Sequence, residues 1–471
     1  MQTSKVGPGA ANYPNGEISY WVASTSGDAA RAPLTSSDEV DVAVVGAGFT
    51  GLWTAYYLSR AAPQLRVAVL EAEHVGYGAS GRNGGWLSHL MPGNRARYAA
   101  GAGGLGGVVA LQRAMTQGVD EVLRVTEAEQ IAADQHRGGN LVLASTPASL
   151  GRLRARREAD LHYGLAPDES ILLSAERTRS RVNADRVLGG VYYPGVARIH
   201  PAKLARGLAR AVEAGGVTIY ERSPARQVRP GAVVTPRATL TARHVLVCAE
   251  GYAGPLLGRR RIIPINSSMI VTEPLSAAEW RRIGWESAEC LSDAAHMFIY
   301  AQRTADDRIA VGGRGVPYRF GSGTGSDGAT AERTARALRA RLERYFPDAD
   351  LRVAHAWSGV LGVTRDWCAS VRHDPATSLG SACGYAGHGV TAANVAARTL
   401  VDLVLDRDTE LTRLPWVNHR SPNWEPEPVR WLGVHGMYRL FRAADAWEER
   451  RGSARTSLLA RIGSRLAGLH E

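Results

Sequence analysis

The stretch that decides the fold is Asp41-Val-Ala-Val-Val-Gly-Ala-Gly-Phe-Thr-Gly51. Residues 41–45 predict a short buried strand, because four of the five are apolar. Gly46, Gly48 and Gly51 follow at the spacing G-x-G-x-x-G, and apolar residues at helical spacing come next. A strand, a glycine turn and a helix in this order form the context in which the spacing binds a dinucleotide.

The glycines and the acid that follows them have separate physical roles. The first glycine permits a tight turn, the second lets a pyrophosphate approach the backbone, and Gly51 lets the helix lie close to the strand. The helix N-terminus offers N–H groups and a partial positive charge to phosphates. A second strand is predicted at 65–70, and Glu71 after it can accept hydrogen bonds from a ribose diol. An ordinary loop is the alternative, and the flanking elements disfavour it.

The length, charge and cysteine content limit the classes of protein to which the chain can belong. The 471 residues suffice for two or three domains. The net charge of +11 is compatible with nucleic acid or an anionic membrane. However, it comes almost entirely from scattered arginines, so we interpret it as surface composition. The four cysteines lack zinc or disulfide-framework spacing, which predicts reduced thiols in a cytoplasmic protein without a metal site. Neither a signal peptide nor a membrane span is expected.

A second glycine-rich segment, Gly76-Tyr-Gly-Ala-Ser-Gly-Arg-Asn-Gly-Gly85, follows Glu71. It holds too many glycines for a helix or a strand. Ser80, Arg82 and Asn83 within it are residue types that bind phosphates and carbonyl groups. Because such a loop can point several N–H groups at an anion, we predict a second loop that contacts the cofactor. A flexible linker is the alternative.

Further elements follow along the chain. Helices are predicted at 148–165, 200–215 and 331–345, and strands at 137–144 and 190–194 and throughout 262–315. The apolar run 244–249 predicts a central parallel strand. A second glycine turn, Gly384-Tyr-Ala-Gly-His-Gly389, precedes a helix that begins at Thr391.

Four of these segments together carry a family resemblance. Val45–Gly51, Glu71-Ala72, Gly78–Gly85 and Gly384–Gly389 resemble the D-amino-acid oxidase-like FAD oxidoreductases, and most resemble their gamma-glutamylputrescine oxidoreductase branch. The likeness runs from about Ser19 to Leu405. It implies an α/β fold with a Rossmann-like FAD-binding domain of the glutathione reductase type, a mixed or antiparallel substrate sheet and a helical C-terminal tail.

The resemblance also implies domain boundaries. Before these domains, residues 1–37 are rich in Gly, Ala, Ser and Pro and predict an N-terminal arm, of which only Ile18–Val22 is expected to pack on the body. The FAD-binding domain would combine 38–100, 195–261 and 355–420, and the substrate domain would combine 101–194 and 262–354. The C-terminal extension would span 421–471.

The residues that hold the cofactor follow from the same resemblance. Those expected at the pyrophosphate and adenosine are Gly46, Gly48, Phe49, Thr50, Gly51, Glu71, Ala72 and, through its backbone, Val228. Those expected in the second loop are Gly78, Ala79, Ser80, Arg82, Asn83, Gly84 and Gly85. Those expected beside the rest of the cofactor and the flavin are Ala249, Glu250, Gly251, Gly387, His388, Gly389, Val390 and Thr391.

Departures from the family pattern refine the expectation. Some relatives bind flavin through a cysteine before a Thr-x-Asp segment or through a histidine in the glycine loop. Here no cysteine precedes Thr364-Arg-Asp366, and Arg82 replaces the histidine, so FAD should be noncovalent. Sarcosine-oxidase-like relatives anchor a substrate carboxylate with a lysine and an arginine. Thr391 and, roughly, Gly85 stand at those positions, which favours a plain amine or one whose acid lies far from the reacting carbon.

These expectations lead to a predicted reaction. FAD would oxidise the C–N bond of a primary or secondary amine, the imine would hydrolyse, and oxygen would be reduced to hydrogen peroxide. The residues expected to line the pocket are Trp86, His89, Tyr300, Arg314, Trp357 and His388. Each aromatic side chain could instead belong to the core, and His388 could be structural. Ala310 stands where relatives carry the lysine that activates oxygen, so the acceptor is open.

Three alternatives remain at this point. The first is a flavin dehydrogenase or tailoring enzyme that uses an acceptor other than oxygen. The second is a basic nucleic-acid-binding or membrane-binding protein with a vestigial nucleotide fold, although no nucleic-acid motif is present. The third, an NAD(P) enzyme, rests on the first motif alone.

The C-terminal helix leaves a further choice. One of its faces carries Leu458, Leu459, Ile462, Leu466 and Leu469. Such a face suits a membrane surface, but we favour packing on the protein body or on a subunit partner. The sequence defines neither the substrate nor the oligomeric state.

Overall fold

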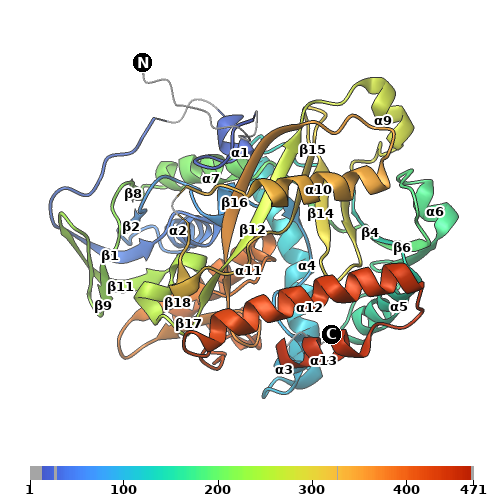
Figure 1. Cartoon of the computed structure of the whole chain (residues 1–471). Coiled ribbons are helices and arrows are strands. Elements are labelled where there is room, and N and C mark those ends of the chain that lie inside the picture. Colours follow the sequence, from blue (N-terminus) through green and yellow to red (C-terminus); the bar gives the residue numbers. More distant parts are fainter. Residues whose placement is uncertain (1–12, 26–28, 326, 468–471) are drawn as a thin grey trace.

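The computed structural model describes residues 13–25, 29–325 and 327–467, which form two eight-stranded sheets, one two-stranded sheet and the helices that cover them (Figure 1). The α/β fold class predicted from the sequence is confirmed. The division of the chain into the domain boundaries given above stays a prediction.

The first large sheet carries the dinucleotide unit. Its strands, in spatial order, are β17 (Ser370–Asp374), β18 (Leu379–Cys383), β11 (Thr239–Val247), β1 (Asp38–Val45), β2 (Val67–Leu70) and β8 (Thr218–Tyr220). The order β18-β11-β1-β2-β8 is parallel throughout, and β9 (Gln227–Arg229) and β10 (Ala232–Val234) extend from β11. Residues 244–247 of the apolar run therefore lie in a central parallel strand, as predicted, and Cys248 and Ala249 follow its end.

Helices bury one face of this sheet, and β9, β10 and Leu34 of the N-terminal arm cover the other, which explains why its central strands are apolar on both sides. The helix α2 (Phe49–Ala61) follows the glycine turn and packs against α7 (Pro201–Ala214) and α11 (Gly389–Val404). Val44, Leu52 and Leu400 belong to the same buried core. Segments more than 300 residues apart in the sequence thus lie together behind the cofactor turn.

The second large sheet is mostly antiparallel. Its strands, in spatial order, are β16 (Val353–Val363), β12 (Ile263–Thr272), β15 (Ile309–Arg314), β14 (Ile299–Arg303), β13 (Cys290–Asp293), β4 (Asn140–Ala144), β6 (Gly189–Tyr193) and β5 (Ile171–Ser174). The helix α10 (Glu332–Tyr345) covers one face, where Ile270, Val311 and Leu338 share a core. Residues of the opposite face lie against the glycine-rich loops of the first sheet.

Shorter elements connect the two sheets. The short strands β3 (Trp86–Leu87) and β7 (Ala197–Arg198) pair with each other. The remaining helices up to residue 413 are α1 (Tyr20–Ala23), α3 (Arg95–Ala99), α4 (Gly104–Ala128), α5 (Pro147–His162), α6 (Ala175–Arg179), α8 (Gly254–Leu257), α9 (Ala277–Ile283) and the single turns η1 (Ala79–Gly81), η2 (Glu250–Tyr252), η3 (Phe320–Ser322) and η4 (Leu411–Arg413).

The N-terminal arm packs more extensively than the sequence indicated. Within the expected segment 18–22, Trp21 is buried and its Nε1 donates to the Asn83 carbonyl over 2.8 Å. Outside that segment, Asn15 pairs with Ala356 of β16, and Arg31 forms an ion pair with Glu213 over 2.6 Å. The expectation that one short segment alone would pack is therefore wrong, because polar backbone and charged groups also fix the arm.

The C-terminal extension forms α12 (Val429–Arg451) and α13 (Leu458–Ala467), which lie beside each other (Figure 1). Ala460 of α13 is buried, whereas Leu458, Leu459 and Ile462 are exposed. These three side chains therefore do not pack on the body of the protein, and packing on a subunit partner, which the favoured interpretation also allowed, stays a prediction. The side chain of Leu466 and the whole of Leu469 lie outside the described part of the chain. In that described part, no helix combines the length and apolar character that a membrane crossing requires.

Candidate active site

The turn after β1 is held by backbone contacts. Gly46 has a φ of +107°, and its N–H donates to the Leu70 carbonyl over 2.7 Å. A Cβ atom on Gly51 would stand 1.8 Å from the Gly46 carbonyl oxygen. Backbone atoms cannot move away as a flexible side chain can, so this position excludes every other residue. The close approach of helix to strand, expected from the glycine spacing, is present.

Glu71 lies at the carboxyl end of β2, beside this turn. Its carboxylate accepts hydrogen bonds from the N–H of Ala47 over 2.7 Å and of Glu73 over 3.0 Å. Burial raises the pKa of Glu71 to about 7, although the two hydrogen bonds act in the opposite direction. The acid therefore stands next to the turn at the place where a dinucleotide ribose is bound in such folds.

The second glycine loop is joined to the first turn. The Phe49 N–H donates to Ser80 Oγ over 2.8 Å, and a Cβ on Gly48 would stand 2.9 Å from that oxygen. Asn83 Oδ1 accepts the Gly85 N–H over 2.7 Å. The two loops are therefore joined to each other and form one glycine-rich cradle.

Arg82 reaches three carbonyl groups, those of Tyr77 over 3.0 Å, Ser358 over 3.2 Å and Glu17 over 2.6 Å. Its guanidinium thereby ties the second loop to β16 and to the N-terminal arm. This geometry gives Arg82 a positioning role, and the predicted contact between Arg82 and the cofactor stays a prediction.

Glu250 connects two distant parts of the cradle. It follows β11 and has a φ of +41°. Both of its carboxylate oxygens accept hydrogen bonds from backbone N–H groups. Oε2 accepts the Gly384 N–H over 2.8 Å, and Oε1 accepts those of Tyr385 over 3.1 Å and Gly362 over 3.3 Å. Burial raises the pKa of Glu250 to about 7, against the effect of these hydrogen bonds.

The C-terminal glycine turn lies at the start of α11, against α2. The hydroxyl groups of Tyr385 and Thr50 lie 3.1 Å apart. His388 is the exposed N-cap residue of α11, and Gly387 has a φ of +105°. Thr391, in the first turn of α11, has a buried Oγ1 with no partner among the described residues. The positive end of this helix therefore lies beside the glycine turn, where it can stabilise an anionic group.

These features fit FAD. Glycines line both loops, Glu71 lies beside the first turn, and the buried Thr391 Oγ1 has no partner among the described residues. The other predicted cofactor residues lie on the same loops or their flanks. Val228 lies in β9, Ala249 caps η2, and a Cβ on Gly251 would stand 2.7 Å from Val360 Cγ1. The individual contacts of these residues with FAD stay predictions.

The predicted substrate-side residues separate into two groups. Tyr300 belongs to the group near the cradle, because a Cβ on Gly84 would stand 2.7 Å from its ring. Its ring is perpendicular to that of Trp86, with centroids 6.1 Å apart, and its hydroxyl lies 2.8 Å from Ser267 Oγ. Arg314 lies on β15, directly opposite Ser267 on β12.

Trp357 and His89 form the second group, which is more deeply buried. Trp357 packs against Trp21, and its Nε1 donates to the Arg82 carbonyl over 2.9 Å. The His89 ring lies 5.3 Å from that of Tyr193, and burial lowers the pKa of His89 to about 4. His89 is therefore neutral at physiological pH. Whether either residue contacts substrate stays a prediction.

The sequence reasoning did not select several residues that the fold brings to this site. Gln302 Nε2 donates to the Gly84 carbonyl over 2.7 Å, and the two-residue spacing from Tyr300 could have indicated it. Tyr385 lies within the glycine turn quoted above, but it was not selected. Ser267 sits in an apolar strand that gives no signal, and Tyr438 lies on α12, whose position the sequence does not define.

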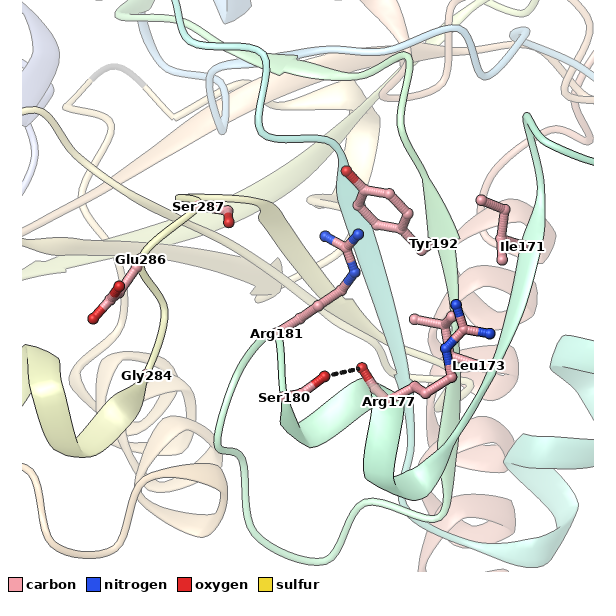
Figure 2. A pocket seen from close by; sticks show the side chains of 9 residues that line it. All are labelled: Ile171, Leu173, Arg177, Ser180, Arg181, Tyr192, Gly284, Glu286 and Ser287. Atoms are coloured by element: carbon pink, nitrogen blue, oxygen red, sulfur yellow. Dashed lines mark hydrogen bonds between the residues drawn. The ribbon is translucent and has the colours of Figure 1, made fainter.

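A separate hollow of about 590 Å³ lies at the β5–β6 edge of the second sheet (Figure 2). Its lining residues include Arg177, Arg181 and Tyr192, and the Arg181 guanidinium forms an ion pair with Glu289 over 3.1 Å. None of the predicted cofactor or pocket residues lines it. The cofactor cradle and this hollow are therefore different features of the molecule.

The fold and the paired glycine turns define a dinucleotide-dependent oxidoreductase. The chain belongs to the FAD-dependent oxidoreductase (DAO) family, whose model matches residues 41–403. The resemblance stated from the sequence is thus confirmed, and the cofactor is FAD.

Individual relatives agree with this assignment. Gamma-glutamylputrescine oxidoreductase of Escherichia coli (strain K12) is 32% identical over 395 residues, which are 82% of this chain and 88% of that protein. The probable oxidoreductase OrdL of Rhizobium meliloti (strain 1021) is 31% identical over 81% of this chain and 86% of its own length. The crystal structure of glycine oxidase from Geobacillus kaustophilus superposes with a TM-score of 0.67 at 20% identity, covering 81% of this chain and 99% of that one.

Proposed function

We propose that the protein oxidises the C–N bond of a primary or secondary amine. Noncovalently bound FAD would supply the acceptor for the hydride that leaves the carbon next to nitrogen. The resulting imine would hydrolyse, and oxygen would be reduced to hydrogen peroxide. The names of two relatives, gamma-glutamylputrescine oxidoreductase and glycine oxidase, support a nitrogen compound as substrate.

The observation that carries this proposal is the character of the wall beside the cradle. Tyr300, Trp86 and Ser267 form it, and they contribute aromatic rings and a hydroxyl pair rather than a carboxylate. These half-buried side chains offer no negative charge, and Arg314 lies opposite Ser267, so the wall disfavours an ammonium ion and favours the neutral amine. Hydride loss from a neutral amine requires no general base.

The chain's own groups would orient the reaction. The N-terminus of α11, with Thr391 in its first turn, directs a partial positive charge towards the predicted flavin position. Tyr300 and its partner Ser267, on the side of the site opposite α11, would position the amine. The four cysteines are buried and free, which is consistent with a noncovalent flavin.

One observation favours the dehydrogenase alternative. Within the described residues the single lysine is Lys203, whose Nζ is 2.7 Å from Asp134 Oδ2. A charge-paired lysine on α7 gives no free ammonium group to promote electron transfer to oxygen. The same site would then reduce the flavin with an amine and pass the electrons to another carrier.

Stopped-flow spectroscopy distinguishes these cases. The holoenzyme is mixed anaerobically with monoamines, polyamines, ω-amino acids and N-methyl amino acids, and the visible flavin absorbance is followed. We expect at least one amine class to bleach it, and admission of air to restore it with release of hydrogen peroxide. Bleaching without peroxide would support the dehydrogenase, and a flavin that no amine reduces would contradict the proposal.

A further inference from the structure

We propose that the C-terminal helices dock the protein on the surface of a membrane that contains anionic lipids. The docking surface, here called the C-terminal face, consists of Leu458, Leu459 and Ile462 of α13 together with the exposed Arg455 and Arg461. This inference goes beyond the proposed oxidation and does not depend on it. Both C-terminal helices lie outside the segment that the family model matches.

The first argument is the exposure of apolar side chains on α13. Its exposed apolar residues are Leu458 at 68%, Leu459 at 66% and Ile462 at 46%. Ile462 lies three and four positions after the two leucines, so the three side chains are neighbours on the helix surface and form one stripe. The other side of α13 packs on α12, because Ala460 is buried and a Cβ on Gly463 would stand 2.7 Å from Leu440 Cδ2. The stripe therefore presents uncovered apolar area to an external partner.

The second argument is the position of the acidic residues of the extension. Between residues 429 and 467 the sequence holds eight arginines but only three acids, which are Asp445, Glu448 and Glu449. Asp445 accepts two backbone N–H groups of the loop before β14, each over 2.8 Å. Glu448 lies 2.8 Å from Arg152 of α5, and Glu449 forms an ion pair with Arg344 of α10. All three acids therefore bond to the body of the protein and fix α12 there.

The third argument is the charge that remains on the outside. Exposed arginines without a carboxylate partner among the described residues are Arg439, Arg442, Arg455 and Arg461. A short helix with leucine and isoleucine on one face and arginines beside them is the pattern that lies in the headgroup region of an anionic bilayer. Each arginine near such a surface strengthens binding about fivefold. The C-terminal face offers both contributions together.

The same charges disfavour other partners. In a twofold dimer one surface meets its own copy, so the arginines beside the stripe would approach arginines, while the three acids are bonded elsewhere. Nucleic acid would suit the arginines but has no apolar region for the leucines. An anionic bilayer satisfies both. The sequence alone favoured a subunit partner, and this distribution of charge reverses that preference.

Vesicle flotation of the full-length holoenzyme tests the inference. One set of vesicles contains phosphatidylcholine alone, and the other is an equal mixture of phosphatidylcholine and phosphatidylglycerol. The fraction of protein bound is measured against lipid concentration at low and high salt. The variants are Ile462→Gln and the double variant Arg455→Gln/Arg461→Gln.

Matched controls change the same residue types elsewhere. Ile18→Gln replaces an exposed isoleucine next to α1, and Arg281→Gln/Arg282→Gln replaces two exposed arginines of α9. The helices α1 and α9 lie at the top of Figure 1 and α13 at the bottom. Retained flavin and thermal unfolding check that each variant folds, which we expect because every replaced side chain is exposed.

We expect the wild type to bind the mixed vesicles and not those of phosphatidylcholine alone, and high salt to weaken binding. Ile462→Gln should lower the affinity about 5- to 30-fold, because part of an apolar side chain no longer leaves water. Arg455→Gln/Arg461→Gln should lower it about 25-fold at low salt and reduce the dependence on salt. The two controls should bind like the wild type.

Three results would overturn the inference. The first is a failure of the wild type to bind the mixed vesicles at low salt, or equal binding to both kinds of vesicle. The second is binding that the control variants weaken as much as the variants of α13. The third is a dimer, detected by light scattering, that Ile462→Gln dissociates while no vesicle is bound, since the apolar stripe would then belong to a subunit interface. If Ile462→Gln does not fold, the arginine variant and the salt dependence decide.

Discussion

The turn at 46–51, which is part of the cradle, and the sheet face around Tyr300, which lies against the cradle, are built in different ways. The turn is fixed by backbone atoms, as shown by the 1.8 Å between a Cβ on Gly51 and the Gly46 oxygen. The sheet face is made of side chains from β12, β14, β15 and α12, which contact each other through hydroxyl groups and rings. The cofactor side should therefore tolerate few substitutions, whereas the substrate side should tolerate single substitutions without loss of the fold.

Gly51→Ala should have the largest effect, because the new methyl group would collide with backbone. We expect a loss of about 4 kcal/mol or more of unfolding free energy and no retained FAD. Thermal unfolding and the ratio of flavin to protein absorbance measure both effects. Gly106→Ala is the control, since this exposed glycine of α4 has nothing within 4 Å and should gain about 0.5–1 kcal/mol. Equal behaviour of the two variants would contradict the steric argument.

Glu250→Gln should have an intermediate effect on the cofactor side. The amide can accept at one end only, so at least one N–H of Gly362, Gly384 or Tyr385 loses its acceptor, at a cost of about 1–3 kcal/mol. FAD should be retained less tightly in the variant. Glu39→Gln, at an exposed position, is the control, and equal losses in both would show that the carboxylate does not join the turns.

The pH dependence of that loss sharpens the prediction. Burial raises the folded-state pKa of Glu250 to about 7 from its ordinary 4.5. A raised carboxyl pKa stabilises the fold fully below pH 4.5, and this stabilisation disappears as the pH rises through 7. The difference in unfolding free energy between flavin-free wild type and Glu250→Gln should thus be larger at pH 5 than at pH 8. A difference that grows with pH would contradict the burial argument.

Tyr300→Phe should have the smallest effect, and it tests the substrate side. It removes the hydroxyl that pairs with Ser267, which should cost about 1 kcal/mol and lower kcat/KM for an amine by about tenfold or less, with the FAD content unchanged. Tyr192→Phe removes a hydroxyl bonded to the Gly138 carbonyl on the same sheet, away from the cradle. It should lose similar stability but keep kcat/KM. Loss of flavin from Tyr300→Phe would show that the two sides are not separate.

The sequence predicted the cofactor side well because its determinants are local. Gly46, Gly51 and Glu71 lie within one strand–turn–helix–strand unit, and steric rules assign each of them a role. The carboxylate of Glu250 bonds to an N–H that lies 134 residues away, and no periodicity reveals such a pairing. The composition of residues 1–37 likewise gave no sign that Arg31 would form an ion pair with Glu213.

The substrate side was harder to predict for a related reason. Tyr300 and Arg314 were selected as residue types that suit a pocket, but Trp86, His89 and Trp357 differ in burial in ways that alternation along a strand does not disclose. The Tyr438 ring lies near the Arg314 guanidinium only because α12 docks beside this sheet, where His435 Nε2 donates a hydrogen bond to the Tyr318 carbonyl over 2.8 Å. The docking of α12 depends on tertiary contacts that local sequence patterns do not reveal. The helix also lies outside residues 41–403, which the family model matches.

The central claim is that backbone turns from both ends of the chain hold FAD without a covalent bond. The most direct measurement is the absorption spectrum of the supernatant after the purified holoenzyme is denatured by heat and the precipitate is removed. The account predicts free FAD in an amount equal to the protein. A colourless supernatant, with the flavin either absent or retained in the precipitate, would contradict it.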